Sequence, residues 1–357
     1  MPKFNIQEGK SGYIPGISRL FFEVEKENNI DKKEFPSWWN WLYKNNPHSI
    51  QKVLIGVDTE DTVVAHMAMV PFKFVKNGKF FMGGLICQLM VAEEFRKELL
   101  FMQMELRILK EYKDAGIDFA YGLLNRPNVL KAHLALGFRQ LGILPVYARP
   151  YKLDSVASYF IKNKLMNRMI KPIIFMLHPI LRLRWHPGSK IEINKIELFD
   201  SDIDVFCRTI QRHFSCCALR NSEILNWRFT QLSERKYQIF IARDEGTIVG
   251  YVVLRRMKMK QICTMAIVDI FFSPDRFDVG KALLNTVHKK SVKSKVEMSA
   301  CLLNPHNPLL PVLKKFGFLK TPESFSLIAH EPNDSLVSPE ECSFDKWHIT
   351  WFDHDLV

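Results

Sequence analysis

One order of elements occurs twice in this chain, and this duplication limits the folds that the chain can adopt. Gly83 to Phe138 reads as an apolar strand, a basic turn, a long helix, a second apolar strand, an Asn-containing turn and a helix that ends at Gly-Phe. Cys263 to Phe318 repeats the strand, an arginine, the helix, the Asn turn and the Gly-Phe ending. A recurring supersecondary order predicts duplicated domains rather than one large sheet.

The length and composition of the chain agree with such a duplication. A chain of 357 residues provides for two domains of roughly 100–200 residues each. We expect a first domain at 1–150, a basic apolar helical linker at 151–190 and a second domain at 191–357. The 47% hydrophobic and 25% charged content is typical of a soluble globular protein.

The cysteines and the first residues of the chain indicate the cellular compartment in which we expect the protein. The seven cysteines form no CxxC pair and no zinc spacing, which favours reduced thiols and a cytoplasmic protein. The first twenty residues lack the apolar core of a signal peptide.

Within the first copy, the pattern predicts each element in turn. Residues 85–92 form an apolar strand, and helical spacing of apolar residues follows the charged residues after it. Residues 117–124 form a second, buried strand. Asn125 and Pro127 predict a capped helix start, and Gly137 predicts its end in a left-handed conformation.

The flanking segments predict further elements. A helix and loop are expected around residues 21–29, a hairpin turn at Asn77-Gly78 and a closing strand pair near Leu141 to Arg149. The tail from Trp347 predicts a last strand. An aromatic cluster precedes the hairpin, and it either anchors a helix to the core or stacks on a substrate: Trp38, Trp39, Trp41 and Tyr43.

The segment 155–187 is both apolar and basic, and two interpretations of it remain open. It either packs as a linker between the domains, which we prefer, or lies on an anionic membrane surface. Its charges and two prolines make it too interrupted to span a bilayer.

The strand, Arg96, the helix, the second strand, Asn125 and the Gly137-Phe138 pair resemble the GNAT superfamily of acyl-coenzyme A N-acyltransferases. The repetition resembles its tandem-domain bacterial members and, more distantly, the Fem-type aminoacyltransferases. The resemblance implies an α/β (α+β) fold of two tandem GNAT-like domains, each a mixed central sheet flanked by helices.

The resemblance also implies a binding site for acetyl-CoA or another acyl-CoA in the first copy. Backbone N–H groups of the turn after the first strand would hold the pyrophosphate at a helix N-terminus. This chain has Leu99 and Phe101 where the family has small residues. The implied cofactor-binding residues are Leu89, Met90, Val91, Ala92, Arg96, Lys97, Glu98, Leu99, Leu100, Phe101, Asn125 and Asn128.

The catalytic residues are less constrained. The family often supplies an acid four residues before Gly-Phe, where this chain has His133 in the first copy and Leu313 in the second. His133 either donates a proton or makes a structural hydrogen bond. The family's base position holds Gln88, so Glu93 and Glu94 are candidate bases acting through water, or solvated charges at a helix start.

Two further residues carry open alternatives. Asp269 is either a buried hydrogen-bonded carboxylate or a contact to the substrate amine. His66 either lies in the core or lines the acceptor side.

Three functions follow from these observations. The resemblance implies N-acyl transfer, most simply of an acetyl group, from acyl-CoA to a primary amine of a small molecule or peptide. A non-catalytic scaffold and Fem-like transfer from charged tRNA are the alternatives. The net charge of +12 suits an anionic partner, but we expect neither DNA nor a metal ion.

Overall fold

The computed structural model describes residues 4–25, 30–48, 52–76, 78–152, 190–331, 344 and 347–354. The first half contains β1 (Phe4–Glu8), α1 (Ile14–Val24), α2 (Phe35–Tyr43), β2 (Lys52–Asp58), β3 (Val63–Lys76), β4 (Lys79–Val91), the 3₁₀ helix η2 (Glu93–Glu98), α3 (Leu100–Glu111), β5 (Phe119–Leu124), α4 (Pro127–Ala135) and β6 (Arg139–Pro150).

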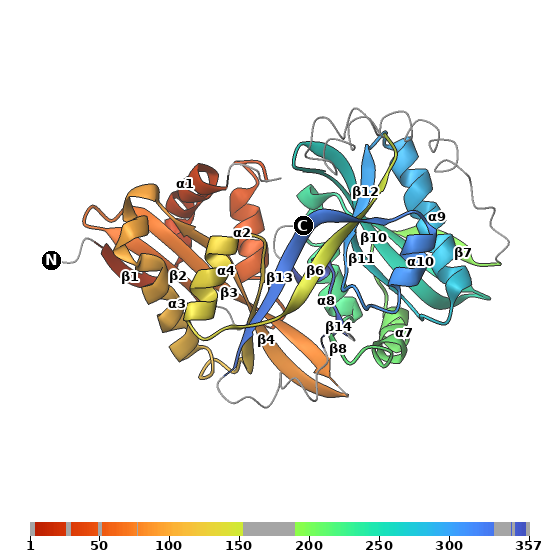
Figure 1. Ribbon diagram of the computed structural model, residues 1–357, viewed down its shortest axis with the longest axis horizontal. Helices are drawn as coiled ribbons and strands as arrows, with labels where there is room; N and C mark the ends of the chain where they lie inside the picture. Colours follow the sequence, from red (N-terminus) through yellow and green to blue (C-terminus); the bar gives the residue numbers. More distant parts are fainter. Residues whose placement is uncertain are drawn as a thin grey trace.

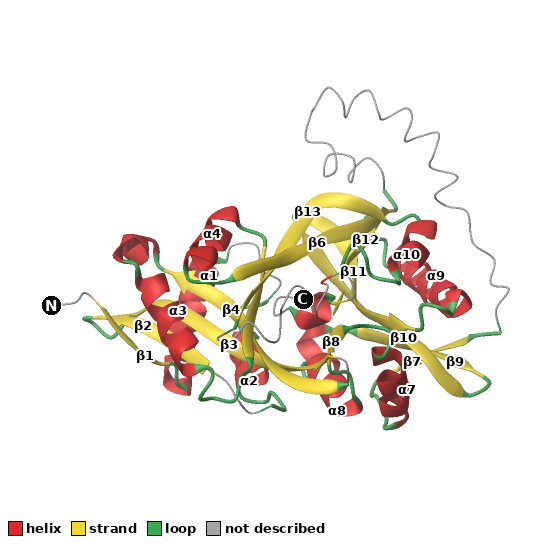
Figure 2. Cartoon of the chain, turned by 60° about the horizontal axis from the view of Figure 1, so that its bottom comes forward, coloured by secondary structure: helices red, strands yellow, loops and turns green. Residues whose placement is uncertain are grey.

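The second half repeats this order. It contains β7 (Glu192–Ile196), α7 (Asp202–Gln211), β8 (Cys216–Ala218), α8 (Ser222–Phe229), β9 (Gln238–Asp244), β10 (Thr247–Met259), β11 (Ile262–Phe272), α9 (Phe277–Lys293), β12 (Met298–Leu302), α10 (Leu310–Lys315), β13 (Leu319–His330), β14 (Trp347–His348) and the 3₁₀ helix η5 (Trp351–Asp353). Helices flank the sheet in both halves (Figures 1 and 2).

The two halves exchange their last strands. The sheet has fourteen strands in the described residues, with the order β1-β2-β3-β4-β5-β13-β6-β12-β11-β10-β9-β7 along its main path. β13 of the second half therefore lies between β5 and β6, while β6 of the first half pairs with β12. Figure 1 shows β6 and β13 side by side where the halves meet.

This exchange corrects two expectations. The duplicated halves share one continuous sheet, and the expected closing strand pair near Leu141 is the single strand β6. β5 would otherwise end in an unpaired edge, and strand edges that lack a partner readily recruit one. Each half supplies the strand that covers the other.

The aromatic cluster joins the halves through their cores. All four aromatic side chains of the cluster are buried, so the anchoring interpretation is confirmed. Trp41 on α2 stacks on Trp227 on α8, with ring centroids 5.2 Å apart. Each indole N–H donates to the other residue's carbonyl, at 2.7 and 3.2 Å. This reciprocal pairing is what two copies related by a two-fold arrangement make.

The turns and helix ends predicted from local sequence signals were only partly confirmed. Gly137 has φ +92° after α4, and Gly78 has φ +77° between β3 and β4, as predicted. The helix α4 begins at Pro127, as predicted, but the asparagine cap was wrong, because the N-cap is Arg126 and makes no side-chain capping bond. The first helix was also misplaced, since α1 begins at Ile14.

The ends of the second half differ from expectation as well. The tail strand is only β14, two residues long, followed by η5, so most of the predicted last strand was wrong. The segment 155–187 lies outside the described residues. Among those described, no helix has the length and apolar character that crossing a membrane requires.

Candidate active site

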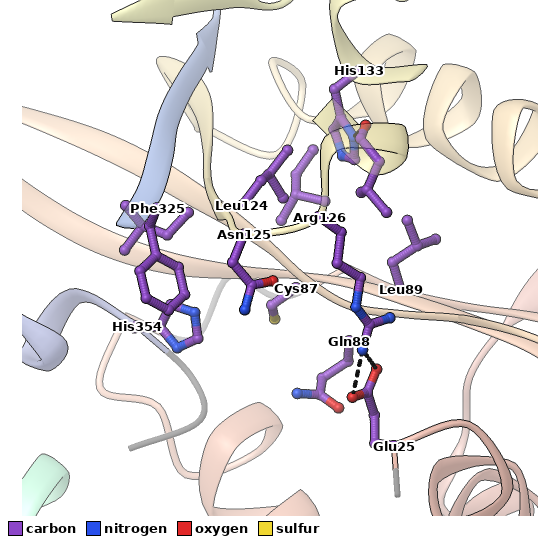
Figure 3. Close-up of a pocket in the computed structure, with 13 residues that line it drawn as sticks. Glu25, Cys87, Gln88, Leu89, Leu124, Asn125, Arg126, His133, Phe325 and His354 are labelled. Atoms are coloured by element: carbon purple, nitrogen blue, oxygen red, sulfur yellow. Dashed lines mark hydrogen bonds and ion pairs between the residues drawn. The ribbon is translucent and has the colours of Figure 1, made fainter. Parts of the chain in front are cut away.

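The first candidate site is the wedge between β4 and β5. The two parallel strands pair only through Gly83–Leu85 and Phe119–Tyr121, and both then continue beyond the last pair. A cavity of about 260 Å³ occupies the opening (Figure 3). It is lined by Glu25, Ile86, Cys87, Gln88, Leu89, Leu123, Leu124, Asn125, Arg126, Val129, His133, Phe325 and His354.

A β-bulge shapes the β4 side of this wedge. His66 faces Met90 and Ala68 faces Cys87, so Gln88 and Leu89 together oppose the single residue between them on β3. Gln88 has φ +52°, a left-handed conformation that costs a non-glycine residue about 1–2 kcal/mol. Bulges redirect a strand and recur next to active sites.

The turn after β4 contains a left-handed backbone conformation that favours glycine, but a leucine occupies this position. Leu99 has φ +56° at the N-cap of α3, and its side chain is 60% exposed. The N–H groups of the first turn of α3 have no partner within the helix, so this end suits an anion. Arg96 is exposed beside it and donates through Nε to the Val91 carbonyl at 3.3 Å. The Phe101 ring turns inward, 5.4 Å from the His133 ring.

His133 and Glu105 form a buried pair behind the cavity. The Nδ1–H of His133 donates to the Val129 carbonyl at 2.8 Å, and its Nε2 lies 3.2 Å from Oε1 of Glu105. Burial raises the pKa of Glu105 to about 8, while burial also lowers the pKa of His133. Glu105 is therefore protonated and His133 neutral at pH 7, so the pair holds its protons without a net charge.

The opposite side of the cavity is polar and aromatic. In Figure 3, Gln88, Asn125 and His354 point toward a common space, and His133 lies apart from them on α4. Arg126 forms an ion pair with Glu25 at 3.0 Å across the rim. The Phe325 and His354 rings lie 5.5 Å apart, edge to face.

His354 is held in place by the second half. Arg228 on α8 donates to the carbonyls of Trp351 and Phe352 at 3.3 and 3.2 Å, and also to the carbonyl of His354. The tail is thereby fixed beside a cavity that belongs to the first half.

The second wedge, between β11 and β12, is filled by the chain itself. These strands pair only through Thr264–Ile267 and Met298–Cys301. Asn304 donates to the carbonyl of Phe344, and Asn307 contacts Nδ1 of His348 at 3.1 Å. On the β11 side, the Thr350 hydroxyl donates to Asp269 at 2.9 Å. The tail residues thus bridge both strands where the first wedge has its cavity.

Asp269 lies at the centre of this closure. Arg220 binds it in a bidentate ion pair with distances of 2.9 and 3.1 Å, and the Tyr251 hydroxyl donates to it at 2.6 Å. All three side chains are fully buried. Burial alone would raise the pKa of Asp269, but Arg220 and His348 keep it far below its usual value. The first alternative for Asp269, a buried hydrogen-bonded carboxylate, describes this geometry.

The other predicted residues divide between the cavity and the surface. Leu89, Asn125 and His133 line the cavity, whereas Glu93, Glu94, Lys97 and Asn128 are exposed and do not line it. Met90 and Ala92 are buried in β4 and just beyond it, while Val91 and Glu98 are half-buried. Leu100 is buried at the start of α3. His66 is fully buried and does not line the cavity, so its acceptor-side alternative was wrong.

Sequence reasoning missed Glu25, Glu105, Phe325 and His354. None of them belongs to a local motif, and three come from elements far from residues 83–138 in sequence. Glu105 had a weak signal, a single acid between apolar residues of a helix. Among the described residues, no group of three or more His, Cys, Asp or Glu side chains is placed to hold a metal ion.

Comparisons with known proteins agree with this geometry. A family model described as an acetyltransferase (GNAT) domain matches residues 5–125. A Saccharomyces cerevisiae N-myristoyltransferase structure with bound myristoyl-CoA is 12% identical, with a TM-score of 0.65 over 93% of this chain and 79% of that one. A search of curated proteins gave no match.

Two bacterial structures are similar to the same extent. A GCN5-related N-acetyltransferase from Anabaena variabilis is 12% identical, with a TM-score of 0.63 over 92% of this chain and 73% of that chain. An Enterococcus faecalis protein described as a probable N-acyltransferase is 14% identical, with a TM-score of 0.59 over 92% and 72% of the two chains. Residues 5–125 therefore match the GNAT domain model, and the chain as a whole has the fold of these structures.

Proposed function

We propose that this protein transfers an acyl group from acyl-CoA to a primary amine, and that the transfer takes place in the wedge between β4 and β5. The observation that carries the proposal is the bulged strand β4, which leaves β5 after Leu85 and lines a cavity with Gln88 and Leu89. Beyond the last pair, the edge of β4 that faces β5 can bond the amides of the cofactor's pantetheine arm, as a strand binds an added strand.

The phosphates of the cofactor would lie at the start of α3. Its first-turn N–H groups and the exposed Arg96 and Lys97 offer donors and positive charge to an anion. The inward turn of the Phe101 ring leaves this end free of that side chain. Glu98, Leu99 and Leu100 contribute backbone to this turn. Asn125, just before α4, and Asn128, in its first turn, are the remaining residues proposed to contact the cofactor.

In the reaction, the amine attacks the thioester carbon, the carbonyl oxygen becomes an oxyanion, and the thiolate leaves. The polar side of the cavity, with Asn125, Phe325 and His354, is where we place the acceptor amine. His133 is the proposed proton donor to the thiolate. Because its ring is neutral, it must first take up a proton, and the protonated Glu105 beside its Nε2 can supply one. The ring must also turn, because both nitrogens have partners in this structure. Glu93 and Glu94 remain candidate bases through water.

We assign the halves different roles. The GNAT domain of the first half binds the cofactor, and the second half shapes the acceptor side through Phe325 and the fixed tail. We take acetyl as the simplest acyl group for this cavity, whose volume is about 260 Å³. A cytoplasmic location is supported by the six described cysteines, none of which forms a disulfide.

An acceptor screen tests the proposal. Purified protein is incubated with acetyl-CoA and a panel of amino sugars, polyamines and peptides, and the released CoA thiol is measured against a protein-free control. Amine-dependent thiol release supports the proposal, and myristoyl-CoA in parallel tests the acyl length. Failure of every acyl-CoA to bind would leave a scaffold role, and competition by charged tRNA would favour the Fem-like reaction.

A further inference from the structure

His66 is a buried side chain that the proposed reaction does not yet use. It lies on β3, next to β4 and away from β5, and is fully buried. Its Nδ1 is 2.9 Å from the carbonyl oxygen of Gln88. Because a carbonyl can only accept, the proton of the neutral ring resides on Nδ1 and is donated to Gln88.

The acceptor of this hydrogen bond is the strained residue of the bulge. Gln88 has φ +52°, and the bulge removes it from regular pairing with β3. A non-glycine residue in this region persists only where the surroundings hold it. The His66 ring provides such a hold from the β3 side.

Because the peptide between Gln88 and Leu89 is planar, fixing the Gln88 carbonyl on one side of β4 also fixes the Leu89 N–H on the other side. In a trans peptide, the carbonyl of Gln88 and the N–H of Leu89 point in opposite directions. β4 lies between β3 and β5, so a Gln88 carbonyl fixed toward His66 directs the Leu89 N–H toward the wedge. Leu89 also lines the cavity there.

His66 is costly to keep for stability alone. Its Nε2 has no hydrogen-bond partner among the described residues, and an unpaired buried polar atom costs stability. Burial lowers its pKa to about 4, so the ring is neutral at physiological pH and contributes no ion pair. Its aromatic neighbour Tyr43, with centroids 6.0 Å away, would pack as well against a phenyl ring. What histidine adds at this position is the Nδ1–H.

Building on the proposed function, we propose that His66 is a positioning residue for acyl transfer. By holding the Gln88 carbonyl, it aims the Leu89 N–H at the oxygen of the thioester, where negative charge develops in the transition state. A backbone donor placed in advance for such an oxyanion is among the larger contributions to catalysis.

Three variants test this role. His66→Phe keeps a ring of similar size but lacks the donor, and His66→Asn places an amide N–H near the position of Nδ1. Met69→Leu, at a buried position of β3 outside the bulge, is the matched control. For each, kcat, the KM for acyl-CoA and thermal unfolding are measured with an amine that the wild-type protein accepts.

We expect His66→Phe to lower kcat about 100-fold and to leave the KM for acyl-CoA within about threefold, because uniform binding is retained. Its melting temperature should equal or exceed that of the wild type. His66→Asn should recover part of kcat, and Met69→Leu should match the wild type. If His66→Phe does not fold, His66→Leu takes its place.

The two proposals fail in different ways. An active wild type with an equally active His66→Phe variant overturns the role of His66 and leaves the proposed function intact. A loss of activity that follows the loss of melting temperature, without recovery in His66→Asn, also overturns it. A wild type that transfers no acyl group to any amine overturns both.

Discussion

The wedge between β4 and β5 and the wedge between β11 and β12 are built from the same elements, but the first contains a cavity and the second is filled by the tail. In each, a bulged strand leaves its parallel neighbour after a few pairs, and an arginine and a helix follow. The first wedge holds a cavity lined by Gln88 and Asn125. The second is crossed by the tail, which bonds Asp269 on one side and Asn304 and Asn307 on the other.

The difference teaches that one fold can present either an open or a filled wedge. The second copy has Leu313 where the first has His133, and it contains the buried Arg220–Asp269 pair. Its filled wedge fixes the tail, and Arg228 places His354 beside the first cavity. The second copy thus contributes Phe325 and His354 to the lining of the first copy's cavity.

The largest expected effect is the loss of stability when the ion pair at the centre of the second wedge is broken. Asp269→Ala leaves Arg220 buried without its main partner, and breaking such a pair costs about 3–5 kcal/mol. Urea unfolding should show this loss, whereas Asp275→Asn, at an exposed position just before α9, should change the free energy of unfolding by about 0.5 kcal/mol or less. A small loss for Asp269→Ala would mean that the pair does not hold the wedge closed.

The second effect concerns the first half and depends on pH. Because burial raises the pKa of Glu105 from 4.5 to about 8, the folded state holds a proton that the unfolded state releases between these values. The free energy of unfolding therefore falls as pH rises from 4.5 to 8. Glu105→Gln should remove this fall and be more stable at pH 7, by on the order of 3 kcal/mol.

Chemical denaturation at pH 5, 7 and 9 measures this effect, with Glu94→Gln at an exposed position as the control. A Glu105→Gln variant that is less stable than the wild type at pH 9 would contradict the assignment, since it would mean that the ionised carboxylate is the stabilising form.

The smallest effect concerns the turn that precedes α3. Leu99→Gly should raise the free energy of unfolding by about 0.5 kcal/mol, because glycine adopts φ +56° freely. Leu106→Gly, at an equally exposed position inside α3, should lower it by about 1 kcal/mol. Thermal unfolding separates the two, and destabilisation by both would show that Leu99 carries a contact rather than strain.

The sequence was informative where a feature depends on neighbouring residues. The repeated order, the Gly137 ending and the position of Asn125 follow from local spacing. Features that depend on contacts between distant segments could not be predicted from the sequence. β6 and β13 look like ordinary closing strands, and their exchange depends on pairing over more than 150 residues. Glu105 reads as one surface acid of a helix, and its burial against His133 appears only once α4 is packed.

The candidate site divides in the same way. Leu89, Asn125 and His133 were found because they belong to the motif-bearing stretch. Phe325 and His354 reach the cavity only through the exchanged strand and the fixed tail, which no local pattern records.

Calorimetric titration with acetyl-CoA tests the central claim, that only the first wedge binds the cofactor. The predicted result is one molecule per chain for the wild type, lost in Arg96→Glu and retained in Arg276→Glu, the matched position before α9, where Asp244 and Asp278 pair with the arginine. Two molecules per chain, or binding that only Arg276→Glu abolishes, would contradict the account.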